Sequence, residues 1–201
     1  ILDSGDALSQ EELSSHLEAI GPGPYAVRSS ASDEDGEAAS FAGQYVSILN
    51  VEDLEGVAKA IEDCQASLES VRAQAYRNAK GGDAAQSMGV VVQAMIAPKA
   101  AGVLFTADPV TGRRDRVVVD AVAGLGEALV SGHSAPDHML ADLSGCVVVS
   151  ELTGETSILS NAEVKQLVTE ALGGVAQWGH PLDFEWAIDQ DGTLWWLQAR
   201  P

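Results

Sequence analysis

Two oxygen donors and a cation lie close together in the last segment of the chain, residues 183–201. The segment predicts a β-hairpin whose connection, Gln190–Thr193, has a common hairpin length. A connection of this length places Glu185 directly opposite Gln198 and puts both side chains on the same face as Arg200. Paired oxygen donors suit Mg2+, which fills its other positions with water and phosphate, and a guanidinium beside them would contact the phosphate.

The opposite face of this hairpin is apolar and predicts a surface that packs into a core. The same register divides the remaining side chains between the two faces. The core face receives Phe184, Trp186, Ile188, Trp195 and Leu197, and the ligand face also receives Asp183, Ala187, Leu194 and Trp196. An ordinary amphipathic hairpin with a solvated polar face would show the same pattern, so the hairpin alone leaves both interpretations open.

A second candidate site follows the short apolar run that starts at Tyr25. Arg28 stands at the end of this run, where Ser29, Ser30 and Ser32 offer hydroxyl and backbone donors around it. A guanidinium among such donors suits phosphate binding. Serine-rich loops are common, so a plain loop is the alternative, and the acidic residues that follow are interpreted as solvated.

Three further positions could line a ligand. Gly43 would let the backbone approach it closely, and Ser47 is polar within an apolar strand. Gln93 is the polar residue inside the β-prone run 88–96, and a buried amide there needs hydrogen-bond partners. A nucleotide base or the neighbouring backbone could supply them. A turn glycine and an edge-strand serine are the alternatives for the first two positions.

Two other motifs are set aside. The glycines of residues 124–132 have the wrong spacing for a dinucleotide-binding loop, so a Rossmann fold is rejected. His133, Asp137 and His138 are close enough in sequence for a zinc site, but no further ligand set at metal spacing accompanies them. Their role stays open.

The elements that would carry these residues alternate without a repeated parallel crossover, which favours an α+β fold. Capping boxes at Ser9–Glu12 and Ser160–Glu163 start two helices, and apolar residues three and four apart predict a long helix over about 52–80. The runs 88–96, 102–106 and 116–122 are expected to be adjacent antiparallel strands of one sheet. Two more strands are expected at 138–143 and 146–150.

The composition narrows the possible partners. The 201-residue chain has a net charge of −19, which argues against nucleic acid or an anionic membrane as the main partner. No apolar run approaches the roughly 20 residues of a membrane span, and the N-terminus lacks a signal-peptide pattern. Cys64 and Cys146 lack metal-type spacing, so buried structural thiols in a reducing cytoplasm are expected. A chain that starts at Ile and ends at Pro is expected to be a fragment.

Several separated stretches occur together in the order of one known family. They are Ala26-Val-Arg-Ser-Ser-Ala31, Phe41-Ala-Gly-Gln44, Val91-Val-Gln93, residues 102–112, Gly124-Leu-Gly-Glu127, Pro136-Asp137, Asp183-Phe-Glu-Trp186 and Leu197-Gln-Ala-Arg-Pro201. From about Tyr25 to Pro201 the chain resembles the nucleotide-binding domain of phosphoenolpyruvate synthase, pyruvate phosphate dikinase and rifamycin phosphotransferase. The resemblance implies an ATP-grasp fold, with antiparallel sheets flanked by helices in two lobes, expected at 1–100 and 101–201.

The resemblance also implies roles for individual residues. Arg28 is similar to the phosphate-binding arginine of the family, and Arg200 to the arginine that stabilises the transferring phosphate, so these two are the expected catalytic residues. Glu185 and Gln198 look like the Mg2+ ligands. The positions that match nucleotide-lining residues are Gly43, Ser47 and Gln93, the last beside the adenine of ATP.

The activity implied by the resemblance is transfer of the β-phosphoryl group of ATP to a histidine on a separate swivelling domain. The swivelling domain would then carry it to pyruvate or to a drug hydroxyl on an acceptor-substrate domain of the same protein. None of His16, His133, His138 and His180 has the sequence context of that carrier. The phosphate-binding lysine segment of the family is also missing before Tyr25, so part of the nucleotide lobe is expected to be absent. A non-catalytic nucleotide-binding module and an ATP-grasp ligase are the alternatives.

Overall fold

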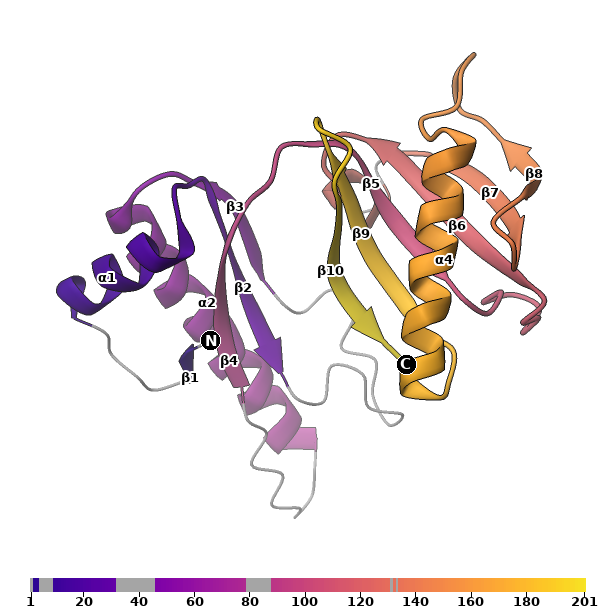
Figure 1. Cartoon of the computed structure of the whole chain (residues 1–201). Coiled ribbons are helices and arrows are strands. Elements are labelled where there is room, and N and C mark those ends of the chain that lie inside the picture. Colours follow the sequence, from indigo (N-terminus) through magenta and orange to yellow (C-terminus); the bar gives the residue numbers. More distant parts are fainter. Residues whose placement is uncertain (1, 4–8, 32–45, 79–87, 131, 133) are drawn as a thin grey trace. The chain divides into compact units, whose positions relative to one another are not determined.

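The computed structural model describes residues 2–3, 9–31, 46–78, 88–130, 132 and 134–201. The chain divides into two compact units, Ile1–Met95 (unit 1) and Ile96–Pro201 (unit 2), each with its own antiparallel sheet (Figure 1). The predicted α+β class is confirmed. Each unit is described by itself below.

Unit 1 has a four-stranded sheet in the order β1-β4-β2-β3. The strands are β1 (Leu2–Asp3), β2 (Tyr25–Ala31), β3 (Ser47–Val51) and β4 (Met88–Ala94). The helices are α1 (Gln10–Ile20) and α2 (Leu54–Asn78). Both helices pack on one face of the sheet, where Val27, Val57, Cys64 and Val90 are fully buried in a single cluster. The other face carries no described helix.

The helices of unit 1 start as the sequence predicts. Ser9 Oγ accepts a hydrogen bond from Glu12 N at 3.3 Å, and Ser9 N donates to Glu12 Oε2 at 2.9 Å, which completes a capping box. In α2, Val57, Ile61 and Cys64 are buried at spacings of three and four, so its apolar stripe faces the sheet.

Unit 2 has a six-stranded antiparallel sheet in the order β10-β9-β5-β6-β7-β8. The strands are β5 (Pro98–Phe105), β6 (Arg116–Ala123), β7 (Asp137–Asp142), β8 (Val147–Glu151), β9 (Asp183–Asp189) and β10 (Leu194–Arg200). The helices are the short α3 (Glu127–Val130) and α4 (Asn161–Trp178). Figure 1 shows α4 lying along one face of this sheet.

One prediction about the strands is wrong. The run 88–96 was expected to share a sheet with 102–106 and 116–122, but β4 pairs with β2 in unit 1. Of the three runs, only the second and third, which form β5 and β6, pair with each other. Residues 95–97 lie outside any strand and connect the two units, so two β-prone runs that are close in sequence belong to different sheets.

The core of unit 2 lies between α4 and its sheet. Val164, Leu167, Val168 and Ala171 form the buried stripe of the helix, and Trp186 lies fully buried on the sheet side. Gly102 makes room for the Trp186 ring. A Cβ atom at Gly102 would lie 1.9 Å from the carbonyl oxygen of Asp120 and 2.8 Å from Trp186 Cζ2, so only glycine fits this position.

A buried carboxylate fastens the segment between β8 and α4. Asp137 is fully buried and accepts hydrogen bonds from Thr153 N, Thr153 Oγ1 and Ile158 N, each at 2.8 Å. Burial raises the pKa of Asp137, but these hydrogen bonds outweigh it and hold the pKa below its usual value. The carboxylate therefore stabilises the fold in its ionised form.

We expect Asp137→Ala to lower the free energy of unfolding of unit 2 by about 3 kcal/mol, because three buried donors lose their acceptor. Since the pKa is lowered in the folded state, the contribution of Asp137 is fully present above the unfolded pKa of about 3.9 and disappears as the pH falls through the folded value. The measurement is urea denaturation followed by tryptophan fluorescence, which reports on unit 2 because all 4 tryptophans lie there.

The control for this prediction is Glu155→Gln, a charge removal at an exposed position of the same segment. Its stability should match that of the wild type. Equal stability of Asp137→Ala and wild type at neutral pH would contradict the role given to Asp137.

Candidate metal and phosphate site

The β9–β10 hairpin brings the predicted ligands together. Gln198 pairs with Glu185 and Arg200 pairs with Asp183, so these four side chains share one face of the sheet. The predicted register at this end of the hairpin is confirmed. Glu185, Gln198 and Arg200 are each partly exposed on that face. Two oxygen donors directly opposite each other form a set that fits a hard cation such as Mg2+.

The predicted register is wrong in the half of the hairpin next to the turn. There Leu194 pairs with Ile188, Trp195 with Ala187 and Trp196 with Trp186. Leu194 and Trp196 consequently pack against the core, whereas the prediction had placed them on the ligand face. Trp195, expected in the core, is 44% exposed.

A β-bulge in β10 separates the two halves of the hairpin and accounts for their different registers. The register shifts between Trp196 and Gln198, so Leu197 is an extra residue in β10 without a partner in β9. The pairing therefore does not place Leu197 on the core face that the sequence had predicted for it. The turn contributes to the offset, because the carboxylate of Asp189 accepts hydrogen bonds from Asp191 N, Thr193 N and Trp195 Nε1. A sequence pattern of strict alternation cannot reveal such a shift.

Helix α4 holds β10 immediately before the bulge. Trp196 Nε1 donates a hydrogen bond to Glu170 Oε2 at 3.0 Å, and the Trp196 ring packs against Phe184 with ring centroids 4.7 Å apart. Glu170 also accepts from Gln166 Nε2 at 3.0 Å on the same helix. Trp196 therefore fixes which side chains of β10 face α4, directly before the segment that carries Gln198 and Arg200.

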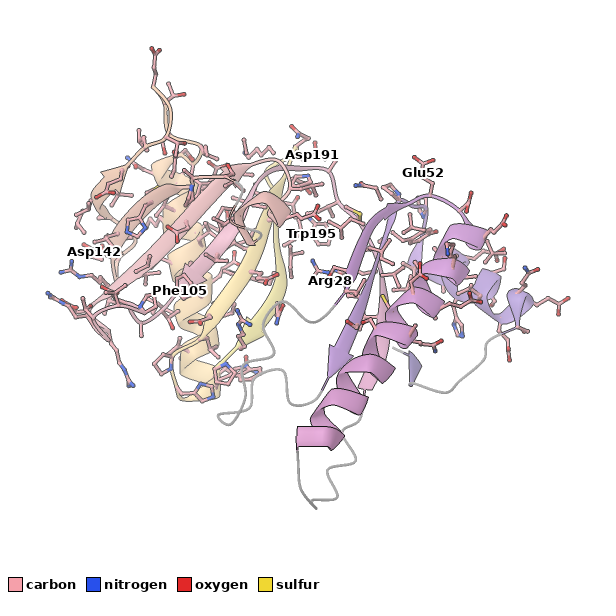
Figure 2. All side chains as sticks on the ribbon, turned by 180° about the vertical axis from the view of Figure 1, so that it is seen from behind. Arg28, Glu52, Phe105, Asp142, Asp191 and Trp195 are labelled. Carbon is pink, nitrogen blue, oxygen red and sulfur yellow. The ribbon has the colours of Figure 1, made fainter. Side chains whose placement is uncertain are left out.

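The face of the sheet opposite α4, here called the open face, is the one turned to the viewer in Figure 2. A row of paired residues crosses all six strands on this face, and it is polar in every strand except β5. Residues directly paired in neighbouring strands point to the same side. In strand order from β10 to β8 the row consists of Gln198, Glu185, Val103, Asp120, His138 and Glu151. Sequence reasoning missed Asp120, although it is the one acidic residue inside the apolar run 116–123.

Unit 1 also places its predicted ligand residues on one face. Arg28 pairs with Ser47 on one side and with Val91 on the other, and Gln93 pairs with Ala26, two residues before Arg28. Arg28, Ser47 and Gln93 therefore share the face away from α1 and α2, and Figure 2 shows Arg28 projecting on that side. Arg28 Nε is buried and has no hydrogen-bond partner among the described residues.

Two expectations about this face need correction. Gln93 is exposed rather than buried, because β1 pairs only with Gly89 and Val90 and leaves this end of β4 at the sheet edge. Ser29 points to the opposite face from Arg28 and exchanges hydrogen bonds with Val46, accepting from its N–H at 3.0 Å. Its hydroxyl therefore serves the fold and is not a phosphate ligand. Gly43 and Ser32 lie outside the described residues.

The zinc site that the sequence analysis set aside at His133, Asp137 and His138 is not seen among the described residues. Asp137 is engaged by the segment before α4, and His138 Nδ1 lies 2.6 Å from Asp120 Oδ1. His133 lies outside the described part. In that part, no group of three or more histidine, cysteine, aspartate and glutamate side chains could hold a metal ion.

The two cysteines differ in their surroundings. Cys64 is buried as expected, and burial together with the neighbouring Asp63 raises the pKa of its thiol. Cys146 is exposed, contrary to expectation, because it lies in the turn between β7 and β8. The cytoplasmic location inferred from the cysteines stays a prediction. In the part of the chain that the structure describes, no helix is long and apolar enough to cross a membrane.

The two α+β units with antiparallel sheets define a class of protein, the ATP-grasp fold. A dinucleotide-forming acetyl-coenzyme A synthetase from Ca. Korarchaeum cryptofilum shares the fold with a TM-score of 0.54 at 16% identity, covering 96% of this chain and 81% of that one. A protein from Pyrococcus horikoshii matches with a TM-score of 0.55 at 14% identity, covering 96% and 80%. The family model "pyruvate phosphate dikinase, AMP/ATP-binding domain" matches residues 7–158 and 142–201, and the chain belongs to that family.

Curated relatives agree with this family. A rifampicin phosphotransferase from Streptomyces sp. is 43% identical over 201 residues, and a probable phosphoenolpyruvate synthase from Methanocaldococcus jannaschii is 35% identical over 201 residues. A prodigiosin synthesizing transferase from Serratia marcescens is 38% identical. Each match covers 88% of this chain but 23%, 17% and 22% of the respective relative. The chain therefore spans about a fifth of the length of these relatives.

The two tryptophans that follow the turn should differ sharply on truncation. We expect Trp196→Ala to lower the free energy of unfolding by about 2–3 kcal/mol, because a partly buried ring that packs against the core is lost, and Trp195→Ala to lower it by less than about 1 kcal/mol. The measurement is urea denaturation followed by circular dichroism, which does not depend on the removed indole. The register predicted from the sequence requires the opposite order, so a larger loss for Trp195→Ala would contradict the bulge.

Proposed function

We propose that this chain is the nucleotide-binding part of a phosphotransferase that transfers the β-phosphoryl group of ATP to a histidine on a separate swivelling domain. The observation that carries the proposal is the pairing of Glu185 with Gln198, with Arg200 on the same face of β10. Membership of an AMP/ATP-binding domain family supports an adenine nucleotide as the ligand. The names of the relatives, a phosphotransferase and a phosphoenolpyruvate synthase, support phosphoryl transfer as the reaction class.

In this proposal Glu185 and Gln198 hold Mg2+ through their side-chain oxygens, and Arg200 binds the phosphate oxygens. Bound Mg2+ would neutralise charge on the phosphates. Phosphoryl transfer needs little covalent help from a protein and depends mainly on positioning and on electrostatic stabilisation of the phosphate oxygens. A rigid sheet suits this task, because neighbouring strands fix the spacing of the side chains that they carry.

The proposal also assigns nucleotide binding to unit 1, on the face of its sheet away from α1 and α2. Arg28 has a buried Nε without a described partner, and an arginine in that state suits a phosphate oxygen, which would accept its N–H. Ser47 and Gln93 lie on the same face and are assigned to the rest of the nucleotide. Gly43 keeps its proposed role in lining the nucleotide, although it lies outside the described residues.

The histidine that receives the phosphoryl group and the domain that binds the final acceptor are assigned to other parts of the protein. The chain corresponds to 17–23% of the length of the relatives considered above, which leaves room for such domains in them. Pyruvate and a small-molecule hydroxyl are the proposed final acceptors.

We expect Glu185→Ala to weaken nucleotide binding about tenfold or more when Mg2+ is present and to leave metal-free nucleotide binding nearly unchanged, because only the metal contact is lost. Isothermal titration calorimetry with a nonhydrolysable ATP analogue, with and without Mg2+, checks this. The control is Asp191→Ala, which removes an exposed carboxylate from the turn of the same hairpin. If Glu185→Ala and Asp191→Ala titrate alike, the metal site is not at Glu185.

Arg28→Ala should weaken binding of the nucleotide with and without Mg2+, since the guanidinium is proposed to contact phosphate directly. The expected loss is about 1.5–3 kcal/mol, the usual value of a hydrogen bond to a charged group. The same titrations measure it, with Lys59→Ala as the control because Lys59 is an exposed cation on α2. An unchanged affinity in Arg28→Ala would contradict the phosphate contact proposed for Arg28.

A further inference from the structure

A histidine backed by a carboxylate lies on the open face of unit 2, outside the site assigned to the metal. His138 in β7 pairs directly with Asp120 in β6, and His138 Nδ1 lies 2.6 Å from Asp120 Oδ1. A carboxylate oxygen accepts hydrogen bonds, so Nδ1 carries the hydrogen and the ring orientation is set. The His138 side chain is 38% exposed. Its Nε2 makes no hydrogen bond with any described residue.

The surroundings of this pair are mostly apolar. On one side of the polar row, the next row across the sheet contains Phe105, Val118 and Leu140. On the other side it contains Ala101 and Val122, both buried. Apolar neighbours therefore flank the imidazole on two sides, and the exposed part of the ring can meet a ligand group. Fixed imidazoles of this kind occur where a protein must present one ring nitrogen in a defined direction.

The pairing along this row gives the distance between His138 and the proposed metal site. Three steps between neighbouring strands separate His138 from Glu185, and each step is about 4.8 Å, so their backbones lie about 14 Å apart. A phosphoryl group bound beside Glu185, an attacking atom about 3 Å from it, and an imidazole ring would together extend over most of that distance. His138 is therefore placed to meet the far side of an imidazole that attacks the phosphoryl group.

We propose that His138 binds the phosphoryl acceptor, an imidazole side chain, and that Asp120 is the positioning residue for His138. This inference rests on the proposed function. The acceptor imidazole forms a bond to the β-phosphorus of ATP through one ring nitrogen, while the bond from that phosphorus to the oxygen shared with the α-phosphate breaks and AMP leaves with the electron pair; water later removes the γ-phosphate. The other ring nitrogen of the acceptor keeps its hydrogen and donates a hydrogen bond to His138 Nε2. No proton and no phosphoryl group passes to His138. The contact fixes the direction from which the acceptor ring approaches.

The test uses the complete protein that contains this chain and compares two substitutions of His138. His138→Asn keeps a donor near the Nδ1 position for Asp120 but lacks an acceptor at the Nε2 position. His138→Gln places an amide oxygen near the Nε2 position instead. Single-turnover formation of acid-labile phosphohistidine from MgATP is measured for both, together with the affinity for MgATP.

We expect His138→Asn to reduce the single-turnover rate about tenfold or more, and His138→Gln to restore a substantial part of it, with MgATP affinity within about twofold of wild type in both. Asp120→Asn should slow the reaction less than His138→Asn and should change the ring tautomer of His138, which nitrogen NMR detects. Glu151→Gln is the control, because it removes a charge directly opposite His138 without altering Nε2.

A merely structural hydrogen bond between His138 and Asp120 predicts the reverse order, with His138→Asn active and His138→Gln impaired, and that order would overturn the inference. Rates within about twofold of wild type in both variants would do the same. A wild-type protein that binds MgATP but forms no phosphohistidine would instead refute the proposed function, and the inference would fall with it.

Discussion

The position of Trp196 on the α4 face of the sheet controls the chemistry of the final hairpin. Its ring packs on Phe184 and its Nε1 donates to Glu170, so β10 cannot rotate at this point. Regular alternation after Trp196 would turn Gln198 toward the core. The extra residue at Leu197 reverses the alternation, and Gln198 and Arg200 therefore point to the open face beside Glu185. A core contact and a bulge together create the candidate metal site.

In both units, core residues and proposed ligand residues lie on opposite faces of the sheet. In each, a long helix, α2 or α4, covers one face of an antiparallel sheet, and the described residues proposed to contact ligands lie on the other face. The pleat places alternate side chains on the two faces, so a strand such as β2 can contribute Val27 to the core and Arg28 to the site. The fold is shared by proteins of different activity, and the function must be argued from the residues on the open faces.

Part of the strongly acidic composition has a structural explanation. Several carboxylates accept backbone hydrogen bonds in turns, and these bonds lower their pKa values. Side-chain hydroxyls contribute first at Asp108 and Asp142, and the Trp195 indole contributes first at Asp189. Such carboxylates organise loops and do not gather at one metal. Glu185 differs from them because its carboxylate stands in the middle of a strand, opposite another oxygen donor.

Local sequence patterns were sufficient to predict most of the helices and the fold of this protein. Capping boxes and apolar spacing located α1, α2 and α4, and the motifs in order led to the family and the ATP-grasp fold. The pairing of Glu185 with Gln198 also followed from the sequence, because a hairpin joins residues that are near each other in the chain. The faces of Trp195 and Trp196, the core position of Ser29, the exposure of Gln93 and the pairing of His138 with Asp120 did not follow from it. The faces of the two tryptophans depend on a β-bulge inside the hairpin, and the other three features depend on contacts with other segments of the chain. Neither a bulge nor a contact of that kind leaves a periodic signal in the sequence.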